Sequence, residues 1–407
     1  MRAFVLAGGL GTRLSRVVKD RPKSMATVAG VPFLEHLLAN LQRQGVVEVV
    51  LLTGHLHEAI EKYFGNGKHF GLDIRYSRER TPLGTGGALR FAFENHSRPS
   101  EDVLIMNGDT YFDIETAILS SFHLAQGAIL SLALKYMRDA RRYGKVILDH
   151  ERIVGFDEKS ASIEEDGLIN GGIYIARASL SDHLTSAGTC SLETDVIPRM
   201  VSEGNVCGLP FSGRFIDIGV PEDYLRAGGE VGICVRTRKK RAVFLDRDNT
   251  LIKDKGYTWR QDELELVAGA PEFLRQVSAL GYELFIVTNQ SGVARGLYTE
   301  SDVTVFMHTL LNELAENGVF IRDYAYCPYH PEGSVAEYRK DSYLRKPKPG
   351  MILDLADRYS IDLEKSFMIG DSRSDMIELS YLRSILLPSI GRFEEAWKVL
   401  EEECDAV

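Results

Sequence analysis

Apolar and polar positions along the chain predict strands that alternate with helices. Apolar runs typical of buried strands occur at Phe4–Ala7, Val46–Leu52 and Val103–Met106, and apolar residues from Phe33 to Leu41 recur at helical spacing. Further strand patterns occur at Ala128–Leu134, Lys145–Leu148, Gly172–Ile175, Ala242–Leu245, Glu283–Val287 and Ser366–Ile369, with a helix pattern at Pro271–Leu280. This alternation predicts an α/β fold with helix-covered sheets, in which ligands bind at the carboxyl ends of strands.

A basic run divides this pattern into two parts. The segment Arg236–Arg241 holds five basic residues, and a new strand pattern starts directly after it. Such a run can mark nucleic-acid binding or a localisation signal, but a solvated linker fits better because no basic neighbourhood surrounds it. We therefore expect two Rossmann-like domains, residues 1–235 and 242–407, joined by a basic linker at 236–241.

The composition narrows the class of protein. The 407 residues carry a net charge of -10 and are 44% hydrophobic, so the chain can bury sizeable cores. An acidic chain is a poor candidate for nucleic-acid binding, and no apolar run approaches the ~18 residues that a membrane span needs. The five cysteines are scattered, which indicates a reducing compartment. We expect a cytoplasmic protein that binds neither nucleic acid nor membranes.

The first chemical pattern is a glycine-rich segment, Leu6–Leu14, directly after the first strand. Its glycines allow backbone N–H groups to face phosphate oxygens, and Arg13 and Lys23 add positive charge. The segment is neither a dinucleotide fingerprint nor a Walker loop. Taken alone, a tight structural turn explains it equally well.

Three later segments add to this pattern. Thr81–Ala88 is a second glycine-rich loop that can approach a flat base, and strand ends carry Asp109 and Asp217. Two carboxylates that meet at strand ends can hold Mg²⁺ against a triphosphate. A single aspartate at a strand end is more often a turn or cap.

In this order the segments resemble the sugar-phosphate nucleotidyltransferases over about residues 1–233, most of all the heptose-1-phosphate guanylyltransferases and the related mannose-1-phosphate and muramate-type enzymes. The resemblance implies a glycosyltransferase-A-like mixed sheet, Mg²⁺ on Asp109 and Asp217, and charge neutralisation by Arg13 and Lys23. It implies nucleotide contacts at Leu6, Ala7, Gly8, Gly9, Gly11, Thr12, Arg13, Lys23, Pro82, Gly84, Thr85, Gly86, Asn107 and Asp109. It implies sugar-phosphate contacts at Gly144, Glu158, Lys159 and Asn170.

The second chemical pattern begins with Asp246 and Asp248 after an apolar strand. Asp246 at the strand tip can attack phosphorus with the help of a cation, and Asp248 can protonate the leaving oxygen and later activate water. Thr288 supplies a hydroxyl after the next strand and Lys346 a cation. The segment Phe367–Asp375 brings carboxylates that complete a metal site.

This ordered set resembles the haloacid-dehalogenase-type phosphatases, which implies a parallel sheet and an aspartyl-phosphate mechanism. Residues 242–390 are most similar to the heptose-bisphosphate phosphatases, which are close to the histidinol phosphatases, through Thr288–Gly296 and Cys327–Ser334. The implied Mg²⁺ ligands are Asp246, Asp248 and Asp371. The implied substrate contacts are Asn289, Gln290, Arg295, Arg345 and Lys346.

One departure concerns zinc. That subfamily often holds zinc through Cys-x-His and a later Cys-x-Cys, where this chain has Cys327-Pro-Tyr329 and Ser342-Tyr-Leu344. Only Cys327 remains at a ligand position, and tetrahedral zinc needs four ligands. We therefore expect no structural zinc and a loop held by packing.

Together the resemblances imply a bifunctional enzyme with GTP and heptose phosphates as partners. One half would dephosphorylate D-glycero-D-manno-heptose 1,7-bisphosphate, and the other would transfer GMP from GTP to the heptose 1-phosphate, giving GDP-heptose for polysaccharide assembly. Three alternatives stay open at this point: another sugar or base, such as mannose 1-phosphate or UTP; a histidinol-phosphatase-like half; or one half that only binds. The nucleotide base, anomer preference and oligomeric state are not resolved by the sequence.

Overall fold

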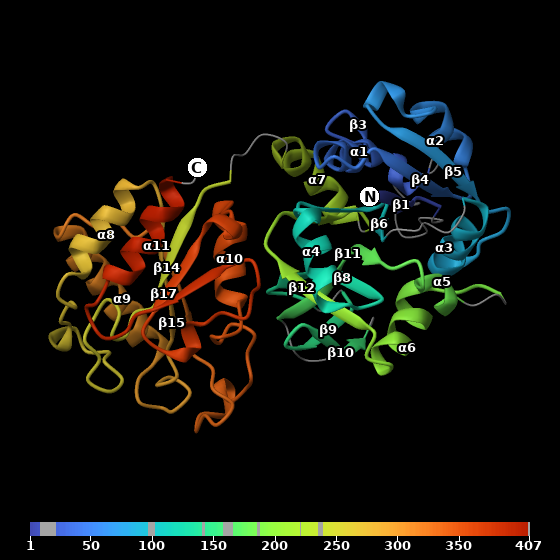
Figure 1. Ribbon diagram of the computed structural model, residues 1–407. Coiled ribbons are helices and arrows are strands. Elements are labelled where there is room, and N and C mark those ends of the chain that lie inside the picture. Colours follow the sequence, from blue (N-terminus) through green and yellow to red (C-terminus); the bar gives the residue numbers. More distant parts are fainter. Residues whose placement is uncertain are drawn as a thin grey trace. The chain divides into compact units, whose positions relative to one another are not determined.

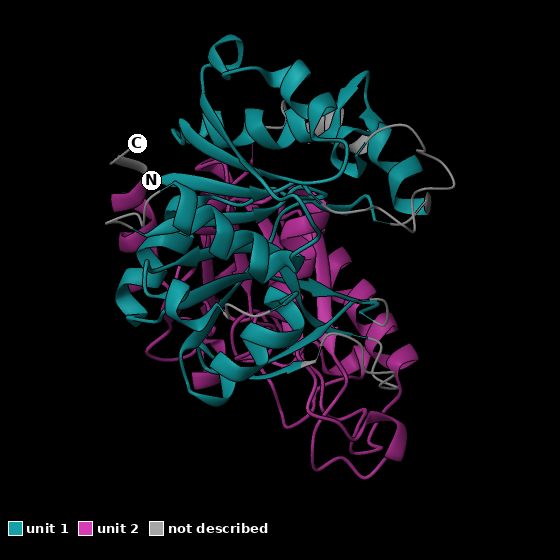
Figure 2. Ribbon diagram, turned by 90° about the vertical axis from the view of Figure 1, so that its right-hand side faces the viewer, with its two compact units in different colours: residues 1–237 teal, residues 238–407 magenta. Residues whose placement is uncertain are grey.

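The computed structural model describes residues 1–8, 22–96, 102–140, 143–157, 166–184, 188–219, 221–234 and 239–405. The chain divides into two compact units, residues 1–237 and 238–407, which Figure 2 shows in different colours. Each unit is described by itself. Within the described residues, no helix has the length and apolar character that crossing a membrane requires.

A mixed nine-stranded sheet forms the centre of the first unit, in the order β5-β4-β1-β6-β11-β8-β12-β10-β9 (Figure 1). Its strands are β1 (Arg2–Leu6), β4 (Glu48–Thr53), β5 (Asp73–Arg78), β6 (Val103–Asn107), β8 (Leu130–Met137), β9 (Lys145–Asp149), β10 (Arg152–Asp157), β11 (Gly167–Ala176) and β12 (Val206–Phe211). β1 pairs in parallel with β4 and β6, whereas β11 is antiparallel to β6 and β8. The expected mixed sheet is confirmed.

Helices and short elements complete the first unit. The helices are α1 (Phe33–Arg43), α2 (His57–Phe64), α3 (Gly84–Asn95), α4 (Thr116–Gln126), α5 (Leu180–His183), α6 (Ile197–Ser202) and α7 (Pro221–Cys234). The short elements are η1 (Lys23–Met25), β2 (Thr27–Val28), β3 (Val31–Pro32), η2 (Lys68–Phe70), β7 (Thr110–Phe112), η3 (Leu192–Val196) and β13 (Phe215–Asp217). In α1 the apolar residues recognised by their spacing are buried, because they form the stripe that faces the core.

A glycine pair changes the course of β11. The sequence predicts a short strand at Gly172–Ile175, whereas β11 is ten residues long and its register shifts between Asn170 and Tyr174. Gly172 has φ +71°, and a Cβ on Gly171 would lie 2.6 Å from the Phe112 ring. Only glycine fits this bend without strain.

The second unit is built on a parallel sheet, in the order β16-β15-β14-β17-β18. Its strands are β14 (Ala242–Leu245), β15 (Glu283–Asn289), β16 (Asp323–Cys327), β17 (Phe367–Gly370) and β18 (Arg383–Leu386). Its helices are α8 (Ala270–Ala279), α9 (Glu300–Glu316), α10 (Gly350–Tyr359) and α11 (Glu394–Asp405), and the 3-10 turns are η4 (Gln261–Glu263), η5 (Ala336–Tyr338), η6 (Leu363–Lys365) and η7 (Arg373–Asp375). The expected parallel sheet is confirmed.

Helices cover both faces of this sheet. On one face, Val243 and Leu245 pack in a core with side chains of α8, α9 and α11, and Figure 1 shows α10 on the opposite side. There the Phe285 ring stacks with Phe244 and lies 5.2 Å from the ring of Tyr359 in α10. Because both faces of the sheet are covered, the central strands β14 and β17 are buried along their whole length and appear in the sequence as continuous apolar runs. The edge strands β16 and β18 are only partly buried and contain polar residues.

Candidate active sites

Two strand ends bring acidic residues together in the first unit. Asp109 follows β6, and the antiparallel pairing of β13 with β7 sets Asp217 opposite Thr110. Lys23 Nζ lies 2.6 Å from Asp109 Oδ2 and 3.6 Å from Asp217 Oδ1. Burial, together with repulsion from Asp109, raises the pKa of Asp217, and Lys23 acts in the opposite direction. The structure thus gathers three residues that the sequence singled out separately.

Close backbone packing supports this group of carboxylates. A Cβ on Gly219 would lie 2.7 Å from Asp217 Oδ1 and 2.8 Å from Lys23 Nζ. A Cβ on Gly108 would lie 2.7 Å from the Leu6 carbonyl oxygen. Side chains at either position would push apart the elements that carry the carboxylates. The carboxyl ends of the neighbouring strands β1 and β6 therefore lie close together beside Lys23. Ala7 and Gly8 directly follow the end of β1.

The loop that opens α3 is tied to a distant segment. The Thr85 hydroxyl donates to Glu193 Oε2 at 2.6 Å and accepts from the Leu192 N–H at 2.7 Å. The Gly86 N–H donates to the Cys190 carbonyl at 2.9 Å. The sequence predicts that Pro82, Gly84, Thr85 and Gly86 contact nucleotide. In the structure the Thr85 side chain holds the loop in place, and the sequence gives no sign of Glu193 because 108 residues separate the pair.

A carboxylate that sequence reasoning missed lies beside this loop. Glu79 Oε2 accepts from the Leu83 N–H at 3.1 Å, and a Cβ on Gly54 would lie only 2.8 Å from Glu79 Oε1. Burial raises the pKa of Glu79. The available signal was an acidic residue at the carboxyl end of β5, just before the glycine-rich loop.

On the expected sugar side, Asn170 accepts from the Gly172 N–H at 3.0 Å and donates to the Tyr174 hydroxyl at 2.8 Å. Asn107 Oδ1 is buried without a hydrogen-bond partner among the described residues. Gly144 directly precedes β9, which pairs with the part of β11 that leads to Asn170. Six further predicted contacts lie outside the described residues: Gly9, Gly11, Thr12, Arg13, Glu158 and Lys159.

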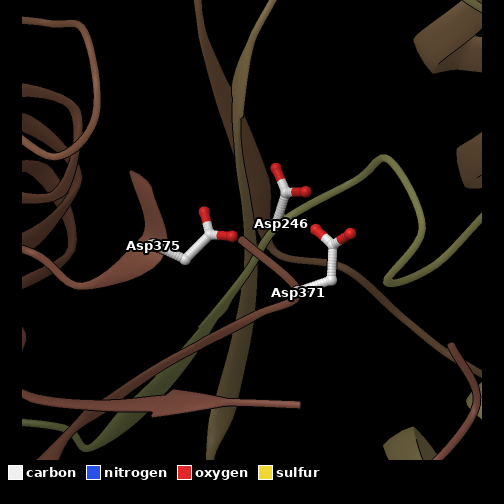
Figure 3. Close-up of side chains that lie close together, drawn as sticks. All are labelled: Asp246, Asp371 and Asp375. Atoms are coloured by element: carbon white, nitrogen blue, oxygen red, sulfur yellow. The ribbon is translucent and has the colours of Figure 1, made fainter. Parts of the chain in front are cut away.

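The second unit gathers three carboxylates at the carboxyl edge of its sheet, as Figure 3 shows. Asp246, Asp371 and Asp375 each offer an oxygen, and these atoms lie within 4.8 Å of one another. Lys346 Nζ lies 2.6 Å from both Asp246 Oδ1 and Asp375 Oδ1. A Cβ on Gly370 would lie 2.2 Å from the Asp375 carboxyl, so glycine lets this side chain pack against the strand end. The donors are oxygen atoms only, which fits a hard divalent cation.

The charges in this cluster are buried. Burial raises the pKa of Asp246 to about 7, with Lys346 opposing and the neighbouring carboxylates adding to the rise. Burial acts to lower the pKa of Lys346, but Asp246 and Asp375 raise it above its ordinary value. Burial, followed by Asp375, raises the pKa of Asp371. When one of these carboxyl groups loses its proton, the negative charge is buried away from water. A bound cation would compensate that charge, so the cluster favours cation binding.

Asp248 lies outside this group of three and is held by other partners. Arg247 Nε donates to Asp248 Oδ1 at 2.8 Å, and Gln290 Nε2 donates to Asp248 Oδ2 at 3.1 Å. Burial raises the pKa of Asp248, and Arg247 opposes the rise. Gln290 also donates to the Thr288 hydroxyl at 2.8 Å, and both side chains are buried. The sequence predicts Asp248 as the acid and base and as a metal ligand, and Gln290 as a substrate contact; in the structure the two side chains are hydrogen-bonded to each other.

The remaining predicted contacts lie around Lys346. The Asn289 carboxamide donates to the Lys346 carbonyl at 3.1 Å and accepts from its N–H at 3.0 Å, which fixes the backbone of the lysine. Arg345 Nη1 donates to the Tyr329 carbonyl at 3.3 Å. Burial, together with repulsion from Arg295, lowers the pKa of Arg345, so these two cations share one region of the site.

The loop with the altered zinc positions is held by tyrosines. The hydroxyls of Tyr326 and Tyr338 donate to the two oxygens of Glu300, at 2.7 Å and 2.8 Å; we call these three residues the tyrosine clamp. Lys340 Nζ lies over the Tyr329 ring, 4.1 Å from its centre. Hydrogen bonds and a cation–π contact therefore hold this part of the chain.

Comparisons with known proteins divide in the same way as the chain. The nucleotidyl transferase family matches residues 2–231, and the polynucleotide kinase 3 phosphatase family matches residues 241–381. D-glycero-alpha-D-manno-heptose 1-phosphate guanylyltransferase of Aneurinibacillus thermoaerophilus is 41% identical over 231 residues, which cover 57% of this chain and 98% of that protein. D-glycero-beta-D-manno-heptose-1,7-bisphosphate 7-phosphatase of Rhodopseudomonas palustris is 44% identical over 138 residues, 34% of this chain and 77% of that protein.

A solved structure adds to this. The crystal structure of HddC from Yersinia pseudotuberculosis complexed with GMP-PN matches with a TM-score of 0.50 and 31% identity. The match covers 56% of this chain and 98% of that one. The similarity therefore extends over nearly the whole of the smaller protein.

Proposed function

The chain belongs to the nucleotidyl transferase family and, through its second unit, to the heptose-1,7-bisphosphate 7-phosphatases, and on this premise we propose that it carries out two steps of GDP-heptose synthesis. Residues 242–407 remove the 7-phosphate of D-glycero-D-manno-heptose 1,7-bisphosphate. Residues 1–235 transfer GMP from GTP to the heptose 1-phosphate and release pyrophosphate, and residues 236–241 link the two domains. The observation that carries this proposal is the presence of both sites in one chain, since the product of one is the substrate of the other.

In the phosphatase half, Asp246 attacks the 7-phosphate and forms an aspartyl phosphate. Asp248 donates a proton to the sugar oxygen that leaves, and then takes one from the water that hydrolyses the aspartyl phosphate. Lys346 and Thr288 bind the phosphoryl oxygens. Mg²⁺ held by the three carboxylates of Figure 3 would neutralise the charge of the phosphate.

In the transferase half, an oxygen of the sugar 1-phosphate attacks the α-phosphorus of GTP, and pyrophosphate leaves. Neither group becomes bonded to the protein, so positioning and charge neutralisation supply the catalysis. Lys23 lies at the two carboxylates, Asp109 and Asp217, that we assign to Mg²⁺. Arg13 and Lys159 keep the roles that the sequence predicts for them.

Glu79 supports guanine as the base. Guanine has two adjacent hydrogen-bond donors on its Watson–Crick edge, N1–H and the N2 amino group, and one carboxylate can accept from both. Uracil has a single donor between two carbonyl acceptors, which a carboxylate would repel. A partly buried carboxylate beside the glycine-rich loop therefore favours GTP over UTP.

Two further proposals concern metal and location. The tyrosine clamp supports a loop that needs no structural zinc, and metal analysis that found one zinc per chain at this loop would overturn this. Cys190, Cys207 and Cys327 are free thiols, which supports a reducing compartment, the cytoplasm.

The test is an assay with Mg²⁺, GTP and heptose 1,7-bisphosphate that follows phosphate, pyrophosphate and GDP-sugar separately. Asp246→Asn should stop phosphate release but leave GDP-sugar formation from added heptose 1-phosphate. Asp109→Asn should do the reverse. Mannose 1-phosphate, UTP and histidinol phosphate serve as competing substrates, and a higher kcat/KM for any of them would replace the assigned substrate. Loss of both activities from one substitution in a folded protein would contradict two separate sites.

A further inference from the structure

Arg247 stands between the two aspartates of the phosphatase site in sequence, yet its side chain points into the core. Only 1% of the residue is exposed. Its guanidinium binds Asp248 Oδ1 through Nε at 2.8 Å and Nη2 at 2.7 Å, donates to the Thr258 carbonyl at 2.9 Å, and lies 4.9 Å from the centre of the Phe306 ring. A buried cation with a fixed fork of donors holds its partner in one orientation.

The second oxygen of Asp248 is held by a chain of hydrogen bonds. Gln290 Nε2 donates to Asp248 Oδ2 at 3.1 Å, and the Tyr298 hydroxyl donates to Gln290 Oε1 at 2.9 Å. This fixes which end of the carboxamide faces the carboxylate. Gly292 gives the Tyr298 ring its place, because a Cβ there would lie 2.1 Å from the ring. Tyr298 therefore determines the orientation of Gln290, and Gln290 that of Asp248.

The two aspartates of the site thus have separate cations. Lys346 contacts Asp246 and Asp375, whereas Arg247 contacts Asp248. A proton donor must lie within hydrogen-bond reach of the leaving oxygen, so a carboxylate that turns freely is in position only part of the time. With both oxygens fixed, Asp248 has one orientation before the substrate arrives.

We propose that Arg247, supported by Gln290 and Tyr298, is the positioning residue that fixes Asp248 for the two proton transfers of the phosphatase reaction. The three residues act through Asp248. The proposal rests on the phosphatase function proposed above.

The decisive experiment compares two phosphate esters in Arg247→Met. An alkyl phosphate such as heptose 1,7-bisphosphate releases a basic oxygen that needs a proton, whereas p-nitrophenyl phosphate releases a stable phenolate that does not. With Asp248 misplaced, kcat on the heptose substrate should fall about 100-fold, in the range of general acid–base catalysis, with KM within about 2-fold. On p-nitrophenyl phosphate the first step should persist while hydrolysis of the aspartyl phosphate slows. The expected result is a burst of about one p-nitrophenol per active site, followed by slow turnover.

Tyr298→Phe is the second variant, because it removes a single hydroxyl and leaves the ring in place. In Tyr298→Phe, kcat on the heptose substrate should fall about 3- to 10-fold, again with a burst on p-nitrophenyl phosphate, because Gln290 loses its orienting partner. Tyr359→Phe removes a phenol hydroxyl that donates to Asp323, away from the site, and should match the wild type.

The outcomes separate the two proposals. Wild-type protein that hydrolyses neither ester would refute the phosphatase function itself. Active wild type with an Arg247→Met variant that is unimpaired, or equally slowed on both esters without a burst, would refute the positioning role. If Arg247→Met does not fold, Tyr298→Phe decides by the same criteria.

Discussion

Each unit places a lysine between two aspartates at the edge of its sheet, but the two groups differ in their exposure to water. Side chains of Lys346, Asp246 and Asp375 are 2%, 10% and 1% exposed, and both contacts measure 2.6 Å. Around Lys23 the contacts measure 2.6 Å and 3.6 Å, and Asp109 and Asp217 are 37% and 28% exposed. A nucleophile that bonds to phosphorus must be in place before the substrate arrives. A site that orients two ligands through charge can remain open, because the ligands complete it.

The largest expected effect comes from replacing the central lysine of each site, Lys346 or Lys23. Lys346→Met leaves buried carboxylates without their cation and should lower the free energy of unfolding of the second unit by about 3–5 kcal/mol. Lys23→Met should cost the first unit about 1 kcal/mol or less, because water screens its partners. Each variant should lose the activity of its own unit. Both tryptophans, Trp259 and Trp397, lie in the second unit, so their fluorescence in urea reports that unit alone, and circular dichroism, which detects both units, supplies the unfolding transition of the first. Equal losses of stability would refute the comparison.

The second test is Mg²⁺. Binding to the three carboxylates of the second unit should raise its unfolding free energy by about 2.7 kcal/mol at 100 times the dissociation constant. Thermal melting followed by tryptophan fluorescence, with Mg²⁺ or with EDTA, measures this shift. Asp371→Asn should remove most of the shift, whereas Asp341→Asn, an exposed carboxylate paired with Lys348, should leave it unchanged. An undiminished shift in Asp371→Asn would place the ion elsewhere.

A smaller effect is expected from the hydrogen bonds that hold the glycine-rich loop of the first unit to the Leu192–Glu193 segment. Thr85→Val breaks the hydrogen bonds to Glu193 and to the Leu192 N–H, and the loosened loop should raise the KM for GTP about 5- to 10-fold, near the 1 kcal/mol of one hydrogen bond. Thr85→Ser keeps the hydroxyl and is the matched control. Steady-state kinetics of GDP-sugar formation measure both variants, and a serine variant as impaired as the valine variant would count against this role.

The smallest effect concerns pH. Burial lowers the pKa of His123, while Asp102 opposes, and its Nδ1 contacts Ser131 Oγ at 2.8 Å. A histidine whose pKa is lower in the folded state stabilises the fold above its ordinary pKa of about 6.5 and loses that contribution as pH falls. We therefore expect the unfolding free energy of the first unit to fall as the pH is lowered from 7 to 5. Urea denaturation followed by circular dichroism measures this, and His123→Gln should flatten the dependence; an equally steep curve would exclude His123 as the cause.

The fold and the first carboxylates could be predicted because they follow from position along strands. Apolar runs mark buried strands, and the residues just after them lie at the carboxyl edge of their own sheet, Asp109 in the first unit and Asp246 in the second. Asp375 belongs to the same cluster, but it reaches it from a turn beyond the strand end, through contact with Gly370. The pattern of strands does not predict which residue of the following loop folds back toward the end of the strand.

Residues that act through a partner were harder to predict. The link between Thr85 and Glu193, and that between Gln290 and Asp248, exist only once distant segments have packed together. Gln290 directly follows the end of β15, a position that predicts a contact with ligand. Its burial next to Asp248 depends on the tertiary structure, which the local sequence does not show. The roles of Arg13 and Lys159 remain predictions from sequence.

The tyrosine clamp has a consequence for the conditions in which the phosphatase can work. Glu300 is the first residue of α9, so the carboxylate that receives Tyr326 and Tyr338 comes from the helix itself. A loop fastened by phenols and a carboxylate is not released by a chelator or closed into a disulfide by an oxidant. If the loop holds no zinc, as proposed above, a cell starved of zinc or under oxidative stress would keep this loop in its folded form, and the phosphatase would depend only on the metal ion of its reaction.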